Sequence, residues 1–160
     1  MRHHLKRLAV AALIAALYCA ITWAVAPIAY GPIQFRLGEL LKPLALKGRQ
    51  YIAGLTVGLF LANLLSPWSG PGELIFMPLA CWAGGEIALI LRRRPIVAIL
   101  AYAFWVSVAV AAMLRLVAGV PFAATLGSIA FSESILMFVG WQASERVFRR
   151  AAQGRTAPPA

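Results

Sequence analysis

The chain has 160 residues, of which 62% are hydrophobic and only 12% are charged, and its formal net charge is +10. Soluble domains usually carry about twice this fraction of charged residues, so the composition excludes an ordinary soluble domain and indicates a membrane protein. The basic residues cluster between apolar runs, where they are typical of topology signals rather than of nucleic-acid binding.

The first apolar run covers residues 8–26 and follows Arg2, Lys6 and Arg7. It is long enough to span a bilayer, which takes about twenty apolar residues, so we expect a signal anchor that is retained as the first helix. Prolines and a glycine between residues 27 and 32 then predict a structured turn. Further helices, separated by turns rich in Gly, Pro or Arg, are predicted over residues 34–46, 51–65, 73–91, 96–118 and 122–147.

These segments predict an all-α membrane protein, a bundle of six transmembrane helices with the N and C termini in the cytoplasm. In this topology only Arg36 and Arg115 lie near the outer side, and Lys42 lies within the second helix. The remaining basic residues fall on the inner side, as the positive-inside rule requires; they are Arg2, Lys6, Arg7, Lys47, Arg49, Arg92, Arg93, Arg94, Arg146, Arg149, Arg150 and Arg155. We expect one transmembrane domain over residues 1–148 and a disordered, basic, proline-containing tail over residues 149–160.

The second and third helices are short for a hydrocarbon core about 30 Å thick. Irregular or interrupted helices are tolerated at membrane depth only where protein covers them or where they line a cavity. We therefore expect a pocket in the outer half of the bundle.

Glutamates within the spans are the first candidates for function, because an ionisable group in a membrane is costly. Glu39, Glu73 and Glu133 are distant in sequence, yet the topology places each in or near the outer half of its helix. The alternatives are an ion pair of Glu39 with Arg36 or Lys42, and a helix-capping role for Glu73. Glu133 has no basic neighbour in the sequence, which favours a functional role for it.

The other glutamates lie near inner helix ends, where we expect Glu86 to pair with Arg92 and Glu145 to be solvated beside Arg149.

Asn63 either bonds a backbone carbonyl or faces the pocket. Trp68 is either an interfacial tryptophan or a lid that stacks on a flat ring. The aromatics interpreted as packing or interfacial residues are Tyr18, Trp23, Tyr102, Trp105 and Trp141.

Small residues recur along the first helix at intervals of three or four. Such spacing lets another helix approach closely, and the sequence leaves open whether that helix belongs to this chain or to a partner. The residues are Ala9, Ala12, Ala16, Ala20 and Ala24.

Catalytic and metal-binding patterns are missing from the sequence. There is no Asp, the only histidines are His3 and His4, and Cys19 and Cys81 are isolated within apolar segments. Neither a nucleotide-binding GxxxxGK[ST] motif nor a hydrolase motif is present. We therefore expect no enzyme, no metal and no cofactor, and any ATP hydrolysis has to come from partner subunits.

The chain contains the segment Ala26-Pro-Ile-Ala-Tyr-Gly-Pro-Ile-Gln-Phe-Arg-Leu-Gly-Glu-Leu40. This segment resembles the signature of the QueT family, whose members are the substrate-binding S components of energy-coupling factor (ECF) transporters. Residues 54–66 resemble the family's third helix and residues 73–80 the start of its fourth. Glu133 falls where the family tends to have a carboxylate. The chain departs from the pattern at Lys42 and Pro43, and Ser107 stands near the place of an expected Asn.

The resemblance implies a non-enzymatic S component in the cytoplasmic (inner) membrane of a prokaryote. Its substrate would be a queuosine precursor, a 7-deazaguanine base captured from outside. Its partners would be a transmembrane coupling subunit, docked on the alanine-rich first helix, and two cytoplasmic ATPases. The alternatives are an S component for another vitamin or purine-like ligand, a membrane-embedded enzyme, and a structural membrane protein.

A guanine-like edge presents adjacent N–H donors and a carbonyl, which a carboxylate and an amide or guanidinium can match. We assign the carboxylate to Glu133 or Glu39, and a second one, for a ligand carrying an aminomethyl cation, to Glu73. The other expected substrate-binding residues, which would donate to the carbonyl or stack on the ring, are Tyr30, Gln34, Arg36, Asn63 and Trp68.

Overall fold

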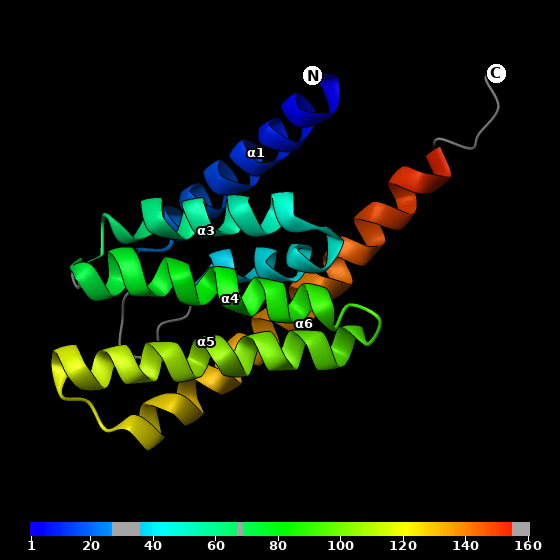
Figure 1. Ribbon diagram of the computed structural model, residues 1–160. Helices are drawn as coiled ribbons and strands as arrows, with labels where there is room; N and C mark the ends of the chain where they lie inside the picture. The colour runs from blue at the N-terminus through cyan, green and yellow to red at the C-terminus, as the bar shows by residue number, and fades with distance from the viewer. Residues whose placement is uncertain (27–35, 67–68, 155–160) are drawn as a thin grey trace.

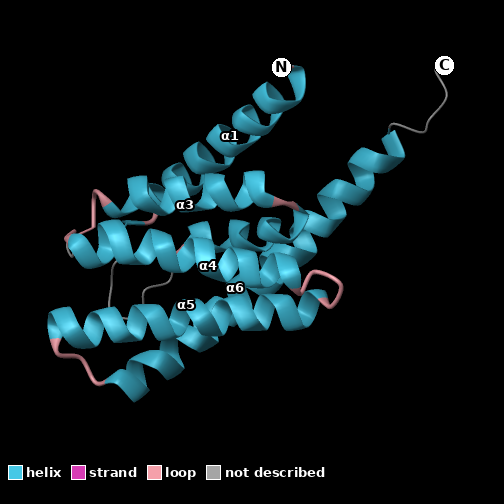
Figure 2. Ribbon diagram, viewed as in Figure 1, coloured by secondary structure: helices cyan, strands magenta, loops and turns pink. Residues whose placement is uncertain are grey.

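The computed structural model describes residues 1–26, 36–66 and 69–154, and all regular secondary structure within these ranges is helical (Figure 2). An all-helical protein was predicted, and this is confirmed. The elements in order are α1 (Arg2–Ala24), η1 (Leu37–Lys47), α3 (Arg49–Asn63), η2 (Gly72–Phe76), α4 (Met77–Ile90), α5 (Pro95–Ala118) and α6 (Phe122–Gly154). η1 is a 3₁₀ helix, and η2 is one turn of π-helix that continues into α4.

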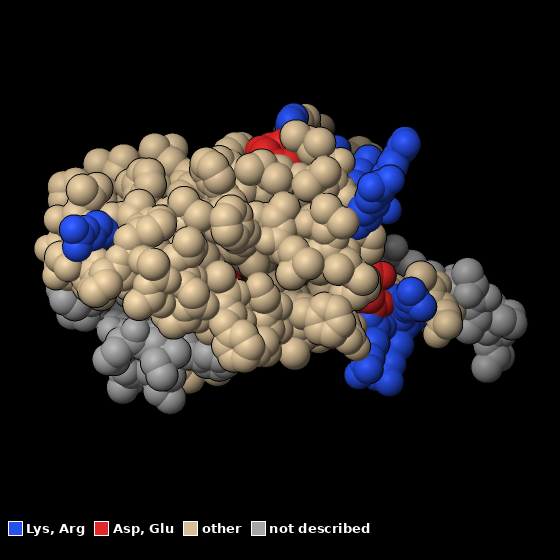
Figure 3. All heavy atoms as spheres, turned by 90° about the horizontal axis from the view of Figure 1, so that it is seen from below, with Lys and Arg blue, Asp and Glu red and all other residues tan. Residues whose placement is uncertain are grey.

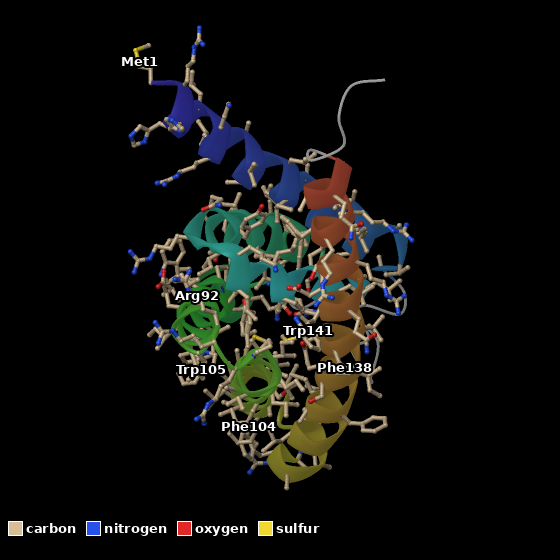
Figure 4. All side chains as sticks on the ribbon, turned by 90° about the vertical axis from the view of Figure 1, so that its right-hand side faces the viewer. Met1, Arg92, Phe104, Trp105, Phe138 and Trp141 are labelled. Carbon is tan, nitrogen blue, oxygen red and sulfur yellow. The ribbon has the colours of Figure 1, made fainter. Side chains whose placement is uncertain are left out.

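Among the residues that the structure describes, four helical stretches are long and apolar enough to cross a membrane: α1, η2 with α4, α5, and α6. Large apolar side chains cover their outer surface; Leu79, Phe104 and Phe131 are 64%, 60% and 71% exposed. Phe104 points away from the bundle in Figure 4, and the body of the molecule in Figure 3 is almost free of charge. An apolar exterior around buried charged groups is the arrangement of a multi-pass membrane protein.

The element that organises the bundle is η1, which packs against α1, α3, α4, α5 and α6. In Figure 1 it is the cyan helix behind α3 and α4. An α-helix was expected over residues 34–46, whereas the structure has a 3₁₀ helix of 11 residues. In an α-helix the ring of Pro43 would clash with the carbonyl four residues earlier, and the surrounding helices cover a backbone that lipid would not tolerate.

The two ends of the chain extend farther as helix than was expected. α1 begins at Arg2 rather than at residue 8, and α6 continues to Gly154, so residues 149–154 are helical rather than part of a tail. Arg, Ala and Gln are good helix formers, which explains the extension of α6. The N-terminal end of α1 and the C-terminal end of α6 project on the same side of the bundle (Figure 1).

Close packing of α1 on α3 depends on two glycines. A Cβ atom at Gly54 would lie 2.6 Å from the carbonyl oxygen of Ala11, and one at Gly58 would lie 2.9 Å from that of Ala15. The buried face of α1 includes Ile14, Ala15 and Tyr18. The alanine series of the sequence analysis lies on the exposed face, so it is not the face that packs within this chain; its members are Ala9, Ala12, Ala16, Ala20 and Ala24.

The substitution Gly54→Val should force α1 away from α3, because the added side chain would overlap the backbone of Ala11. We expect destabilisation of about 1–3 kcal/mol, measured as thermal unfolding of the detergent-solubilised protein. Gly127→Val is the matched control, since a Cβ at Gly127 meets nothing within 4 Å. Equal effects of the two substitutions would show that helix propensity, and not packing, explains the loss.

Candidate functional site

Charged and polar side chains from several helices meet in the interior of the bundle. Arg36, Glu39, Lys42, Glu73 and Glu133 are each at most 5% exposed. Arg36 precedes η1, Glu39 and Lys42 lie on η1, Glu73 lies on η2 and Glu133 lies on α6. We refer to these five residues as the buried charge cluster.

The 3₁₀ conformation of η1 explains why two of these groups share one face. Glu39 and Lys42 are three residues apart, and a 3₁₀ helix has three residues per turn, so their side chains are in register; Arg36 precedes the helix with extended backbone. All three line the same internal cavity. Their spacing in the sequence therefore becomes a row of charges along the cavity wall.

Glu39 is the most fully engaged carboxylate of the cluster. Its Oε2 forms an ion pair with Lys42 Nζ, and its Oε1 accepts a hydrogen bond of 2.5 Å from the Tyr18 hydroxyl. Lys42 Nζ also lies 5.5 Å from the centre of the Tyr102 ring, close enough for a cation–π contact. Tyr18 and Tyr102 were interpreted as packing aromatics, but both also have polar roles, since the Tyr102 hydroxyl donates to the carbonyl of Cys81.

A second part of the cluster joins η1 to α3 and η2. Arg36 Nη2 lies 3.0 Å from Glu73 Oε1, and Arg36 Nη1 donates to Asn63 Oδ1 at 3.3 Å. Asn63 Nδ2 donates to the backbone carbonyl of Glu73 at 2.9 Å. Asn63 was expected either to bond a backbone carbonyl or to face the pocket; it bonds a carbonyl, and it also holds the guanidinium.

The cavity at the cluster is lined by Arg36, Glu39, Lys42 and Glu133, together with Leu59, Met77, Val106, Val110 and Ile129. The volume open to the centre of a water molecule is about 10 Å³, which holds about one water. Small-molecule pockets typically measure about 300–1,000 Å³, so this cavity is far smaller than such a pocket. Glu133 Oε2 lies 3.9 Å from Lys42 Nζ and has no hydrogen-bond partner among the described residues.

A larger groove of about 300 Å³ lies beside the cluster, between residues 69–73 and the C-terminal part of α5. Glu73 lines this groove and Arg36 lines the cavity, so the Arg36–Glu73 ion pair stands between the two spaces.

Several expected site residues are thus brought together. Arg36, Glu39 and Glu133 line the cavity, and Asn63 and Glu73 are bonded to Arg36. An ion pair of Glu39 with Lys42 was one of the alternatives given from the sequence, and the structure has this pair. Lys42 was not expected to line the cavity, and its spacing of three residues from Glu39 is the signal that would have linked it to the site. The expected residues Tyr30, Gln34 and Trp68 lie outside the residues that the structure describes.

The remaining glutamates form ion pairs away from the cavity. Glu86 pairs with Arg49 on α3 at 3.1 Å, rather than with Arg92 as expected, because α3 and α4 pack side by side. Glu145 pairs with Lys47 at the end of η1 and lies 4.0 Å from Arg149.

Removing Arg36 should be costly, because it would leave Glu73 as an unpaired charge in the bundle interior. We expect Arg36→Met to destabilise the protein by about 3–5 kcal/mol in thermal or denaturant unfolding, and Glu73→Gln in the same chain to restore part of the loss. Arg49→Met is the control, because the Arg49 side chain is 75% exposed and its pair with Glu86 should contribute only about 0–1 kcal/mol. Similar losses at both arginines would contradict the burial argument.

Comparison with known proteins agrees with the geometry. The sequence profile of the QueT transporter family matches residues 8–144. The queuosine precursor transporter QueT of Lactococcus lactis subsp. cremoris (strain MG1363) is 30% identical over 166 aligned residues, which cover 90% of this chain and 93% of that protein. No solved structure matches the chain. The match over most of its length shows that this chain belongs to the QueT transporter family.

Proposed function

We propose that this protein is the substrate-binding membrane subunit of an ECF-type transporter and that it captures a queuosine precursor, a 7-deazaguanine base, for uptake. Two findings support the substrate class: the family match and the name of the Lactococcus relative. The observation that carries the proposal is the cavity inside the bundle, because carboxylate and guanidinium groups line it together. These groups match the hydrogen-bonding edge of a guanine-like base.

In this proposal Glu133 accepts hydrogen bonds from the adjacent N–H groups of the base, and Arg36 donates to its carbonyl. Glu39 stays paired with Lys42 and Tyr18 and keeps the wall of the site in place. The base enters through the groove beside Glu73 when the Arg36–Glu73 pair separates. We also keep three proposed contacts with the base: Tyr30 and Trp68, which would stack on its ring, and Gln34, which would donate to its carbonyl.

The proposed topology has six spans and both termini in the cytoplasm of a prokaryotic cell. η1 and α3 contain 11 and 15 residues, and each is about 22 Å long, so they would complete the six by crossing inside the bundle rather than against lipid. Arg49, Arg92 and Arg93 line one surface groove, which supports a common basic inner end. The membrane domain would cover residues 1–148, with the helical extension of α6 reaching into the cytoplasm.

The energy for uptake would come from partners: a transmembrane coupling subunit and two cytoplasmic ATPases. The exposed alanines of α1 offer a surface on which a partner helix can approach closely. The packing of α3 against the opposite face of α1 leaves this surface free within the chain.

The ligand proposal is tested by titrating the purified protein with 7-deazaguanines, guanine and common vitamins. We expect 7-deazaguanines to bind most tightly and Glu133→Gln to weaken their binding by about 1–3 kcal/mol, because a buried carboxylate acceptor is lost. Glu145→Gln, at a partly exposed glutamate of the same helix, should leave the affinity unchanged. Preferential binding of an unrelated vitamin would refute the substrate assignment.

The docking proposal is tested by co-purification with the coupling subunit and ATPases. Ala16→Leu on the exposed face of α1 should reduce recovery of the complex several-fold, because leucine holds the helices apart, while ligand binding by the isolated protein should be unchanged. Ala124→Leu, at an exposed alanine of α6, is the matched control. Undiminished assembly of the Ala16 variant would exclude this face as the docking surface.

A further inference from the structure

We propose that the surface groove between the start of α3 and the end of α4 binds the headgroup of an anionic phospholipid at the inner face of the membrane. This inference concerns a site other than the cavity for the base, and it shares with the proposed function only the orientation of the bundle. We call this site the arginine groove; its lining residues are Arg49, Glu86, Leu89, Ile90, Arg92 and Arg93.

The arginine groove is basic and has room for a headgroup. Its volume is about 380 Å³, within the range of about 300–1,000 Å³ that is typical of small-molecule sites. Three arginines and one glutamate line it, so its formal net charge is +2. A guanidinium group offers paired N–H donors that match the oxygens of a phosphate, and a phosphate in this space can accept from more than one arginine.

The pairing of Glu86 explains why the groove keeps its positive charge. Arg49 Nε donates to Glu86 Oε1 at 3.1 Å, and Arg49 Nη2 donates to Glu86 Oε2 at 3.2 Å. The only glutamate of the groove is therefore engaged by Arg49 on the neighbouring helix. Arg92 and Arg93 are exposed, and neither forms an ion pair within the part of the chain that the structure describes.

No acidic side chain of the protein is left to pair with these two arginines. The chain has five acidic residues, and three of them belong to the buried charge cluster in the interior. The other two, Glu86 and Glu145, pair with Arg49 and Lys47. A counter-anion for Arg92 and Arg93 therefore comes from outside the chain.

The surroundings of the groove favour a lipid over a dissolved anion. Ile90 lines the groove and is 77% exposed, and Ile96 at the start of α5 is 52% exposed, so apolar surface lies beside the arginines. In Figure 3 most of the visible basic side chains gather at one end of a body that is otherwise almost free of charge. The phosphate and the acyl chains of a lipid meet at such a boundary, and basic pockets at the cytoplasmic ends of helices bind acidic headgroups.

The test titrates the detergent-purified protein with phosphatidylglycerol and counts the bound lipids by native mass spectrometry. We expect the first phosphatidylglycerol to bind about tenfold more tightly than phosphatidylcholine, whose headgroup has no net charge. Inorganic phosphate and glycerol 3-phosphate should not displace it, because they have no acyl chains to cover the apolar side of the groove. Arg92→Gln/Arg93→Gln should weaken the binding of phosphatidylglycerol by about ten- to thirtyfold.

The matched control is Arg7→Gln/Arg150→Gln, which removes the same charge from exposed residues of α1 and α6 outside the groove. This variant should bind phosphatidylglycerol as the wild type does. Equal losses in the two double variants would overturn the site, because net charge alone would then attract the lipid. Displacement by inorganic phosphate would overturn the lipid as the occupant.

Two further outcomes separate this inference from the other proposals. Unchanged lipid binding by Arg92→Gln/Arg93→Gln, together with reduced recovery of the complex with the coupling subunit and ATPases, would overturn the lipid site and assign the groove to a protein partner. Selective binding of phosphatidylglycerol by a wild-type protein that binds no 7-deazaguanine would support the lipid site and overturn the proposed function.

Discussion

The row formed by Arg36, Glu39 and Lys42 along one wall of the cavity is the feature on which the site depends. Arg36 precedes η1 with extended backbone, whereas Glu39 and Lys42 lie on η1, one 3₁₀ turn apart and therefore in register. In an α-helix two residues three apart would be rotated by about 60° from register. The local backbone geometry of η1 therefore decides which charges meet.

A 3₁₀ helix of this length is stable here only because other helices enclose it, and small residues make the enclosure possible. Gly140 on α6 lies against the carbonyl of Leu40, and Gly38 on η1 lies against Thr22 and Tyr18 of α1. A side chain at Gly140 would overlap the backbone of η1 at Leu40, and one at Gly38 would displace the side chains of Thr22 and Tyr18. The same close approach of α1 brings the Tyr18 hydroxyl to Glu39, so helix packing and the polar site are parts of one arrangement.

Features that depend on composition along the chain were predictable, and features that depend on contacts between helices were not. Apolar runs located the long helices, although α1 begins at Arg2 rather than at residue 8 and α6 ends at Gly154 rather than at residue 147. The cost of buried charge identified Glu39 and Glu133 as neighbours of a cavity. The sequence did not reveal that Glu86 pairs with Arg49 or that Tyr18 bonds Glu39, because each partner lies on another helix. The 3₁₀ form of η1 was also missed, since local propensity favours an α-helix and tertiary packing overrides it.

The small cavity suggests how such a site discriminates among ligands. Glu39 is paired with Lys42 and Glu73 with Arg36, and the cavity holds about one water. In the proposed entry route a larger guest separates Arg36 from Glu73 and then has to satisfy the groups that it parts, because leaving them unpaired is costly. A molecule of the right size but without matching donors and charge gains too little to open the bundle. Selectivity then arises from the pairs that the ligand has to replace as much as from the contacts that it makes.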